Sequence, residues 1–248
     1  MNDNYLIING EYMKINKLKL YLITELVLFI VLLIFQIIYI SQGYLLRDKS
    51  GDLFIGIAIM HIAVTLVSFV FAIYILLINR NDGRIREDLF PIYFLFAFIA
   101  DIFFSFTGYL FMGHVCFIIT YAIFMFIRKA KIYEYIGVLA FGVIALVVIL
   151  VINKLNLTIG LDCFLAPLLL LNMVMCIIRY IKEKNKANLL LMIALILIVV
   201  SDSSIALSTF GSNAILVNAI ALLIWPTYIA GCSLLNWYYS IKRNVENR

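Results

Sequence analysis

Two acidic residues lie inside long apolar stretches of the chain. Asp101 occurs within residues 98–114, a run that also contains His114, and Asp202 occurs within residues 199–208. Placing an ionisable group inside a membrane-spanning segment costs about 2.5 kcal/mol or more, so such groups are functional-site hypotheses by default. Carboxyl and imidazole groups in this setting are suited to general acid–base chemistry or to proton transfer.

The composition is typical of a polytopic membrane protein. Of the 248 residues, 65% are hydrophobic and only 13% are charged, whereas soluble domains average roughly 45–50% and 25%. Apolar runs of about 20 residues, long enough to cross about 30 Å of hydrocarbon, recur along almost the whole chain. We therefore expect residues 1–248 to form a single transmembrane domain.

Eight membrane-spanning α-helices are expected in one bundle. Residues 1–16 are polar and carry no cleavable leader, so the first segment is expected to remain in the mature chain. Pro91 suits the first turn of the third segment, where helical amides have no partner to lose. The expected helices are residues 20–40, 53–78, 88–107, 108–127, 135–152, 161–181, 187–210 and 213–239.

The distribution of lysine and arginine supports this layout. The amino terminus, the connections after the second, fourth and sixth segments, and the carboxyl terminus hold 16 of the 19 cations. Because cations accumulate in cytoplasmic loops, both termini are expected to be cytoplasmic, most simply in a cell (inner) membrane. The net charge of +5 is then explained by the loop cations that set membrane orientation, so nucleic acid is not an expected partner.

Two connections carry no cation and are also the shortest, namely Thr107-Gly108 and Gly211-Ser212. We therefore expect the third and fourth segments, and the seventh and eighth, to form close antiparallel pairs. Each of these turns follows one of the two acids, which hints at a weak internal repeat of four plus four helices. Polar sites between repeats are a known pattern in membrane proteins.

Four ionisable side chains are expected at similar depths below the non-cytoplasmic helix ends. At 1.5 Å per residue, Asp101 and His114 lie about 9 Å deep, and Asp202 and His61 about 12 Å deep. We call these four residues the acid layer. A shared polar cavity explains this coincidence better than four unrelated buried groups, because lipid supplies no hydrogen-bond partner.

The helix faces around the acid layer also suit a cavity. Ser105 follows Asp101 on a stripe of small residues that includes Ala97 and Gly108, and small residues permit close approach of a helix or ligand. The side chains expected to support the two acids are His61, Ser105, His114, Tyr121, Ser201, Trp225 and Tyr228.

Each group also has a structural interpretation. A protonated acid bonded to a serine or a backbone carbonyl would serve packing, and either histidine would serve as a hydrogen-bonding residue. Glu25 is expected to reach the membrane interface or to pair with a lysine. Asp162 is expected to be a helix-terminus acid, and the four cysteines to be free, buried thiols.

Four sequence pieces recur in the same order in one known family. They are Ala100-Asp101-Ile-Phe, a Gly-rich turn with Phe111 three residues before His114, Ser201-Asp202-Ser-Ser-Ile-Ala-Leu, and Thr227-Tyr228. Over roughly residues 95–235 the chain thus resembles the lysoplasmalogenase-like YhhN family of multi-pass membrane proteins. It departs from the family pattern at Ala100, Phe117 and Cys232, where glycine, tyrosine and glutamine are usual.

The resemblance implies hydrolysis of the vinyl-ether bond of a 1-alkenyl lysophospholipid to a fatty aldehyde and glycerophosphoethanolamine or glycerophosphocholine. Protonation of the β-carbon creates an oxocarbenium-like centre, to which water adds. Asp101 and Asp202 would supply one protonated and one ionised carboxyl, with His114 and Tyr228 as supports. No cofactor or metal is expected, because two histidines are few for a zinc hydrolase.

The main alternative is a channel, a transporter or a lipid-binding receptor, in which the same layer binds an ion, a proton or a headgroup. Intramembrane carboxylates also form proton relays, so this hypothesis is physically reasonable. Under the first hypothesis the expected partners are a lysophospholipid substrate and membrane lipids. The residues alone do not separate the two.

Overall fold

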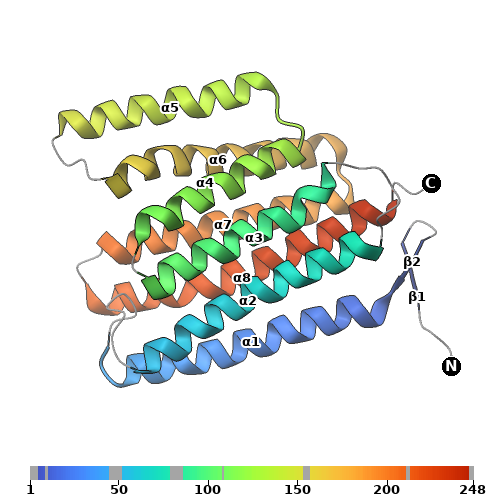
Figure 1. The fold of residues 1–248 in the computed structure, drawn as a ribbon, viewed down its shortest axis with the longest axis horizontal. Coiled ribbons are helices and arrows are strands. Elements are labelled where there is room, and N and C mark those ends of the chain that lie inside the picture. Colours follow the sequence, from blue (N-terminus) through green and yellow to red (C-terminus); the bar gives the residue numbers. More distant parts are fainter. Residues whose placement is uncertain are drawn as a thin grey trace.

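The structure, a computed structural model, describes residues 5–8, 11–44, 52–78, 86–107, 109–152, 157–210 and 213–245. Within these residues, eight long helices form a bundle (Figure 1). They are α1 (Ile15–Ser41), α2 (Asp52–Ile78), α3 (Phe90–Ile102), α4 (Leu110–Ile127), α5 (Ile132–Val151), α6 (Leu157–Glu183), α7 (Lys186–Phe210) and α8 (Ala214–Val245).

Seven of these helices are long and apolar enough to cross a membrane, judged by length and composition. The exception is α5, whose apolar stretch is the shorter Ile132–Val148. The expected all-α, multi-pass membrane fold is therefore confirmed. Eight crossings and cytoplasmic termini remain predictions.

A two-stranded antiparallel sheet that we did not expect precedes α1. Strand β1 (Tyr5–Ile8) pairs with β2 (Glu11–Lys14), so that Tyr5 lies opposite Lys14. In sequence the strands are separated by Asn9-Gly10, a dipeptide typical of tight hairpins. This dipeptide lies within residues 1–16, for which the composition had indicated only a polar character.

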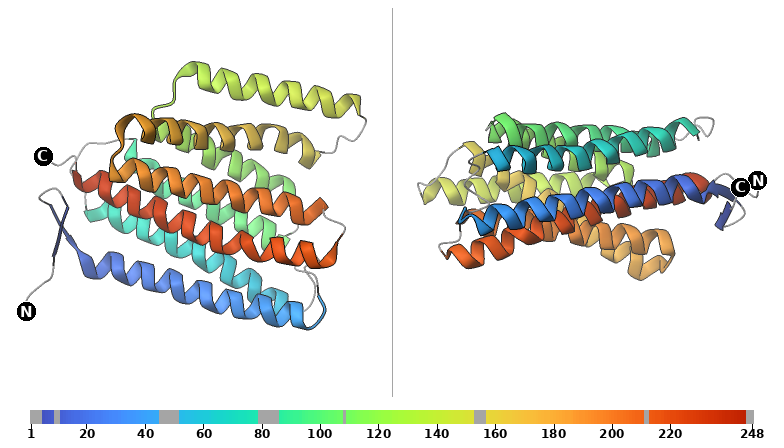
Figure 2. Two further views of the ribbon diagram at one scale, coloured as in Figure 1. Left: turned by 180° about the vertical axis from the view of Figure 1, so that it is seen from behind. Right: turned by 90° about the horizontal axis from the view of Figure 1, so that it is seen from below.

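The helices lie in two rows, which Figure 2 shows most clearly in its right-hand view. One row holds α2, α3 and α4, and the other holds α1, α8, α7 and α6; α2 contacts α1 and α8, and α4 contacts α6 across the rows. Helix α5 packs against α6 at the outer edge of the bundle (Figure 1). The acid-bearing helices α3 and α7 therefore belong to different rows.

The two expected antiparallel pairs are present. Helices α3 and α4 pack along each other, and so do α7 and α8. Residues 108, 211 and 212, which include the glycines of the two short connections, lie outside the described part of the chain. The pairing places one hairpin in each row, with an acid on the first helix of each.

Helix α3 does not continue regularly to its predicted end. Asp101 lies in its last α-helical turn, and a π-helical segment, Phe103–Thr107, follows directly. A π-helix has a wider turn than an α-helix, so Ser105 no longer lies directly one α-helical turn beyond Asp101. The predicted stripe is thus interrupted, and π-helical segments occur frequently at functional sites.

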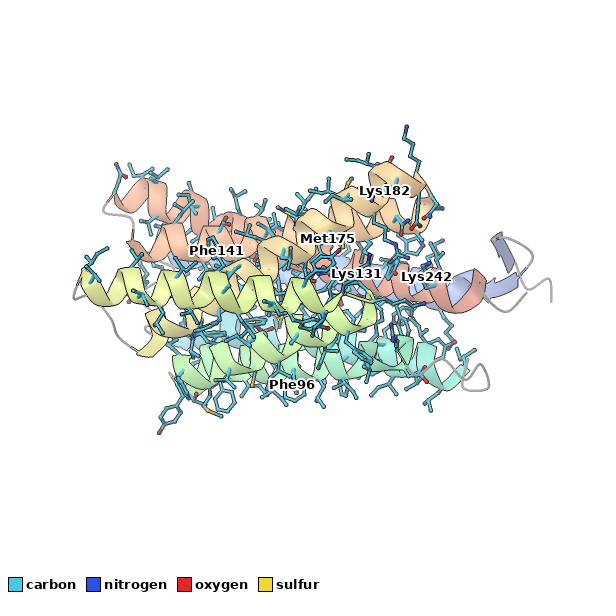
Figure 3. All side chains as sticks on the ribbon, turned by 90° about the horizontal axis from the view of Figure 1, so that it is seen from above. Phe96, Lys131, Phe141, Met175, Lys182 and Lys242 are labelled. Carbon is cyan, nitrogen blue, oxygen red and sulfur yellow. The ribbon has the colours of Figure 1, made fainter. Side chains whose placement is uncertain are left out.

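Lysine side chains from separate parts of the chain lie toward one end of the bundle. Figure 3 shows Lys131, Lys182 and Lys242 toward the end at which β1 and β2 lie. Near this end Arg128 Nη1 is paired with Glu134 Oε2 at 2.6 Å, with both side chains buried. Arg128 Nε donates to Asn172 Oδ1, and Asn172 Nδ2 donates to the backbone oxygen of Tyr121. This network fixes α4 against α6.

The close approach of the π-helical segment to α4 depends on Gly113. A Cβ atom at this position would lie 2.7 Å from Phe104 Cζ. The Phe104 ring cannot easily move aside, because it packs edge-on against His114 and stacks on Phe117.

We predict that Gly113→Ala lowers the free energy of unfolding by about 1–3 kcal/mol through overpacking. Gly137→Ala on α5 is the matched control, because a Cβ there meets no atom of the described residues within 4 Å. It should be neutral or stabilising by up to about 1 kcal/mol, through helix propensity. Thermal unfolding in detergent would compare them, and equal effects would contradict the assigned contact.

Candidate functional site

Asp101 is a buried acid held by hydroxyl groups from two other helices. Its side chain is 5% exposed. The Tyr228 hydroxyl of α8 donates to Asp101 Oδ2 at 3.4 Å, and the Thr65 hydroxyl of α2 lies within hydrogen-bonding reach of the same carboxyl. These contacts give the carboxyl polar partners that lipid cannot supply.

Asp202 is held in a similar way by the opposite hairpin. The Tyr121 hydroxyl of α4 donates to Asp202 Oδ2 at 3.1 Å. The Tyr121 ring is buried and stacks on Phe117, and its backbone oxygen accepts from Asn172. Tyr121 is thus fixed at both its backbone and its ring, so its hydroxyl is a preorganised donor.

The two acids belong to one electrostatic cluster. Asp101 and Asp202 are close enough for their charges to interact, and Tyr93 and Cys232 interact with Asp202 as well. The hydrogen bonds that hold the acids also cross between the two hairpins. Asp101 of α3 accepts from Tyr228 of α8, and Asp202 of α7 accepts from Tyr121 of α4. Each hairpin therefore provides one carboxyl and one phenol, and receives the other group from its neighbour.

His114 lies near this cluster, but both of its ring nitrogens face acceptors elsewhere. Nδ1 lies 2.6 Å from the backbone oxygen of Leu110, and Nε2 lies 3.0 Å from Asp162 Oδ1. The imidazolium form, in which both nitrogens carry protons, would satisfy both acceptors. The ring lies within electrostatic range of Asp202.

Asp162 therefore has a role that the sequence did not suggest. We expected a helix-terminus acid, but α6 begins at Leu157, so Asp162 lies in the second turn and pairs with His114. Its side chain is half exposed, and that of His114 is mostly buried. The pair links α6 to the α3–α4 hairpin at the edge of the acid layer.

His61 joins the site through aromatic contacts. Its ring, buried on α2, stacks on Trp225 with centroids 3.2 Å apart. Trp225 in turn packs edge-on against Tyr228, the donor to Asp101. His61 and Trp225 thus pack beside Tyr228, the residue that donates to Asp101.

The predicted serines differ in their environment. Ser201 and Ser204 are buried, and Ser201 Oγ has no hydrogen-bond partner among the described residues. Ser105 is half-buried within the π-helical segment. Ser201, adjacent in sequence to Asp202, is therefore the serine with hydrogen-bonding capacity to offer a bound water or substrate.

Three polar residues near the acids were missed from the sequence. Thr65 lies one turn from His61 on α2, so helical periodicity from that histidine would have found it. Tyr93 and Cys232 lie among apolar residues, and only the packing of α3 and α8 brings them to the cluster. Their residue types carry no signal that distinguishes them from ordinary core side chains.

The described residues contain no group of three or more histidine, cysteine or acidic side chains placed to hold a metal ion. The carboxyl, phenol and hydroxyl groups described above are suited to acid–base and hydrogen-bonding chemistry. Comparison with protein-family models, with curated proteins and with solved structures found no significant match. The resemblance to the lysoplasmalogenase-like family thus rests on the sequence pieces quoted above.

We predict that the Tyr228 hydroxyl and the Asp101 carboxyl stabilise the fold as a pair. Tyr228→Phe should lower the free energy of unfolding by about 1–3 kcal/mol, because the buried carboxyl loses a donor. In an Asp101→Ala background the same substitution should cost less, and the difference is the coupling free energy.

Unfolding in detergent of the four proteins in this cycle gives the measurement. Tyr133→Phe is the control, since Tyr133 is exposed on α5, and its effect should stay within about 0.5 kcal/mol. Strictly additive effects of the Tyr228 and Asp101 substitutions would show that the two groups do not interact.

Proposed function

We propose that the protein is a membrane-embedded, lysoplasmalogenase-like hydrolase. Its substrate would be a 1-alkenyl lysophospholipid, and its products a fatty aldehyde and the glycerophospho-alcohol. The observation that carries the proposal is the acid pair, in which the buried Asp101 and the partly buried Asp202 interact while each accepts a hydrogen bond from a tyrosine. The sequence resemblance supplies the substrate class.

The acid pair offers what vinyl-ether cleavage requires. The reaction needs a proton donor for the β-carbon and a base for water, both within reach of one bound substrate. Two carboxyls in one low-dielectric cluster favour a state with one proton between them, since two adjacent negative charges repel. Each tyrosine hydroxyl binds one carboxylate oxygen and so orients its carboxyl group.

In the first step the protonated carboxyl transfers its proton to the β-carbon of the vinyl ether. The neighbouring carbon becomes oxocarbenium-like and is stabilised by the ionised carboxyl. Water then adds to this carbon while the ionised carboxyl accepts the proton that water releases. The product of this step is a hemiacetal, and the two carboxyls have exchanged protonation states.

In the second step the hemiacetal collapses. The newly protonated carboxyl gives its proton to the ether oxygen as the carbon–oxygen bond breaks, which releases the alcohol. The other carboxyl takes the hydroxyl proton as the aldehyde forms. Both acids thus return to their starting states, so the cycle consumes one water and needs no cofactor.

Apolar surfaces next to the acid layer suit the alkenyl chain. The rings of Phe104, Phe117 and Tyr121 form a continuous stack that leads to Asp202. A separate cavity of about 270 Å³ with almost entirely apolar walls lies between α4, α5 and α6, and none of its lining residues belongs to the acid layer. Its lining residues are Ile118, Ala122, Tyr135, Val138, Leu139, Phe164 and Leu168.

The reciprocal bonds also favour the four-plus-four repeat. In such a repeat α3 corresponds to α7 and α4 to α8, so each half contributes one acid and one tyrosine, 20 positions apart in the first half and 26 in the second. Each acid is then held by the tyrosine of the other half, as the two bonds are arranged. We extend the proposal to eight crossings with both termini cytoplasmic, supported by the lysines gathered toward one end (Figure 3).

We predict that purified protein in liposomes releases aldehyde from a 1-alkenyl lysophospholipid, but not from the 1-acyl analogue, which has no vinyl ether. Asp101→Asn and Asp202→Asn should each reduce the rate by about 10²–10⁴-fold, because each removes a proton-transfer group. Aldehyde trapped as a hydrazone and quantified by mass spectrometry gives the rate.

Glu183→Gln is the control, because Glu183 lies at the end of α6 and bonds to Asn185 and Asn188, away from the acids. Its rate should equal that of the unmodified protein. If folded protein releases no aldehyde, or if both aspartate variants keep full rates, the hydrolase proposal is wrong. The ion- or proton-binding alternative would then account for the acid layer.

A further inference from the structure

Glu25 is another buried acid, which the proposed hydrolysis does not use. Its side chain on α1 is 2% exposed, whereas Lys17 and Lys19 on the same helix are exposed. The Ser68 hydroxyl of α2 donates to Glu25 Oε1 at 3.0 Å. The expectation that Glu25 reaches the membrane interface is therefore wrong.

Side chains from three helices build a polar site around Glu25. The Tyr21 and Ser68 hydroxyls lie 3.1 Å apart, and Asn236 Nδ2 donates to the Tyr21 hydroxyl and to the Ser68 backbone oxygen. Two acceptors, Glu25 Oε2 and Asn236 Oδ1, are buried without a hydrogen-bond donor in the described part of the chain. A carboxyl with such a free oxygen is suited to receive and release a proton.

Buried polar residues connect this site to Asp101. On α8 they recur every four residues, which places them on one helix face, and all are less than 7% exposed. On α2, Thr65 beside Asp101 lies one turn from Ser68 beside Glu25. We call the set the polar column; its members are Tyr21, Glu25, Thr65, Ser68, Asp101, Tyr228, Cys232, Asn236 and Ser240.

Cys232 lies between the Asp101 site and the Glu25 site in the polar column. Cys232 lies one turn of α8 beyond Tyr228, whose hydroxyl donates to Asp101. The Cys232 thiol interacts electrostatically with both Glu25 and Asp101. The position at which the resembling family usually has glutamine is therefore, in this chain, the link between two acid sites.

We propose that Glu25 is a proton-exchange site, and that the polar column carries protons between Asp101 and the end of the bundle at which α1 begins. Glu25 lies ten residues into α1, about 15 Å from that end. Each transfer breaks one O–H or S–H bond and forms another, so no oxidant or other reactant is needed.

The groups around the two acids suit protons better than metal cations. Tyr21 on α1 and Cys232 on α8 are the titratable groups that face Glu25, and α2 contributes the Ser68 hydroxyl. Asp101 is faced by Asp202, Tyr228 and Cys232. Hydroxyl and thiol groups both donate and accept hydrogen bonds, as proton transfer requires. The proposal does not depend on hydrolysis, because it concerns only exchange at Asp101.

Infrared spectroscopy of the lipid-reconstituted full chain tests this directly. Asp101→Asn identifies the carbonyl band of the protonated Asp101 carboxyl as the band that it removes. After transfer from H₂O to D₂O, the time for this band to shift measures proton exchange at Asp101. We expect Glu25→Gln and Cys232→Ala to slow this exchange several-fold.

Cys176→Ala is the matched control for Cys232→Ala, because both thiols are 2% exposed but Cys176 lies on α6, outside the column. Its exchange should match that of the unmodified protein. Should Glu25→Gln fail to fold, Ser68→Ala removes the donor to Glu25 and keeps the acid. Two results would overturn the proposal. One is proton exchange at Asp101 that stays unchanged both in Cys232→Ala and in a folded variant at the Glu25 site, either Ser68→Ala or Glu25→Gln. The other is a Glu25 carbonyl band that responds to Na⁺ instead of pH.

Discussion

The arrangement of this protein depends on two hydrogen bonds that cross between its two helix hairpins. Tyr228 donates to Asp101 and Tyr121 donates to Asp202, so each hairpin supports the acid of the other. A carboxyl in hydrocarbon is costly without such partners, and neither hairpin supplies a phenol to its own acid in these bonds. Packing of the two hairpins and burial of the acids therefore depend on each other.

This dependence explains the surrounding packing. Tyr121 can serve Asp202 only if α4 is fixed in rotation, and Asn172 and the buried Arg128–Glu134 pair hold it against α6. Tyr228 is positioned by Trp225, which His61 covers. A buried ion pair contributes little net stability but makes other arrangements costly, so it favours a unique position for α4.

The sequence predicted the long apolar helices, and it marked Asp101 and Asp202 as candidate site residues, because both features are visible in local composition. Apolar length identifies spanning segments, and a lone aspartate in such a segment is conspicuous whatever its partners. The contacts of His114 with Asp162 and of Glu25 with Ser68 were not predictable, because each pair is distant in sequence and meets only through packing. The π-helical turn after Asp101 also breaks the periodicity on which the Ser105 prediction relied.

The position of the acids explains how one bundle can hold two separate polar regions. The acid layer joins both rows of helices, whereas Glu25 lies among α1, α2 and α8, and Cys232 interacts with both. A thiol is small and only weakly polar, so it connects the two regions at little cost in burial. A larger amide at this position would add two donors and an acceptor that also require partners. Cys232 therefore lies within electrostatic range of both acid sites, and its thiol costs little free energy to bury.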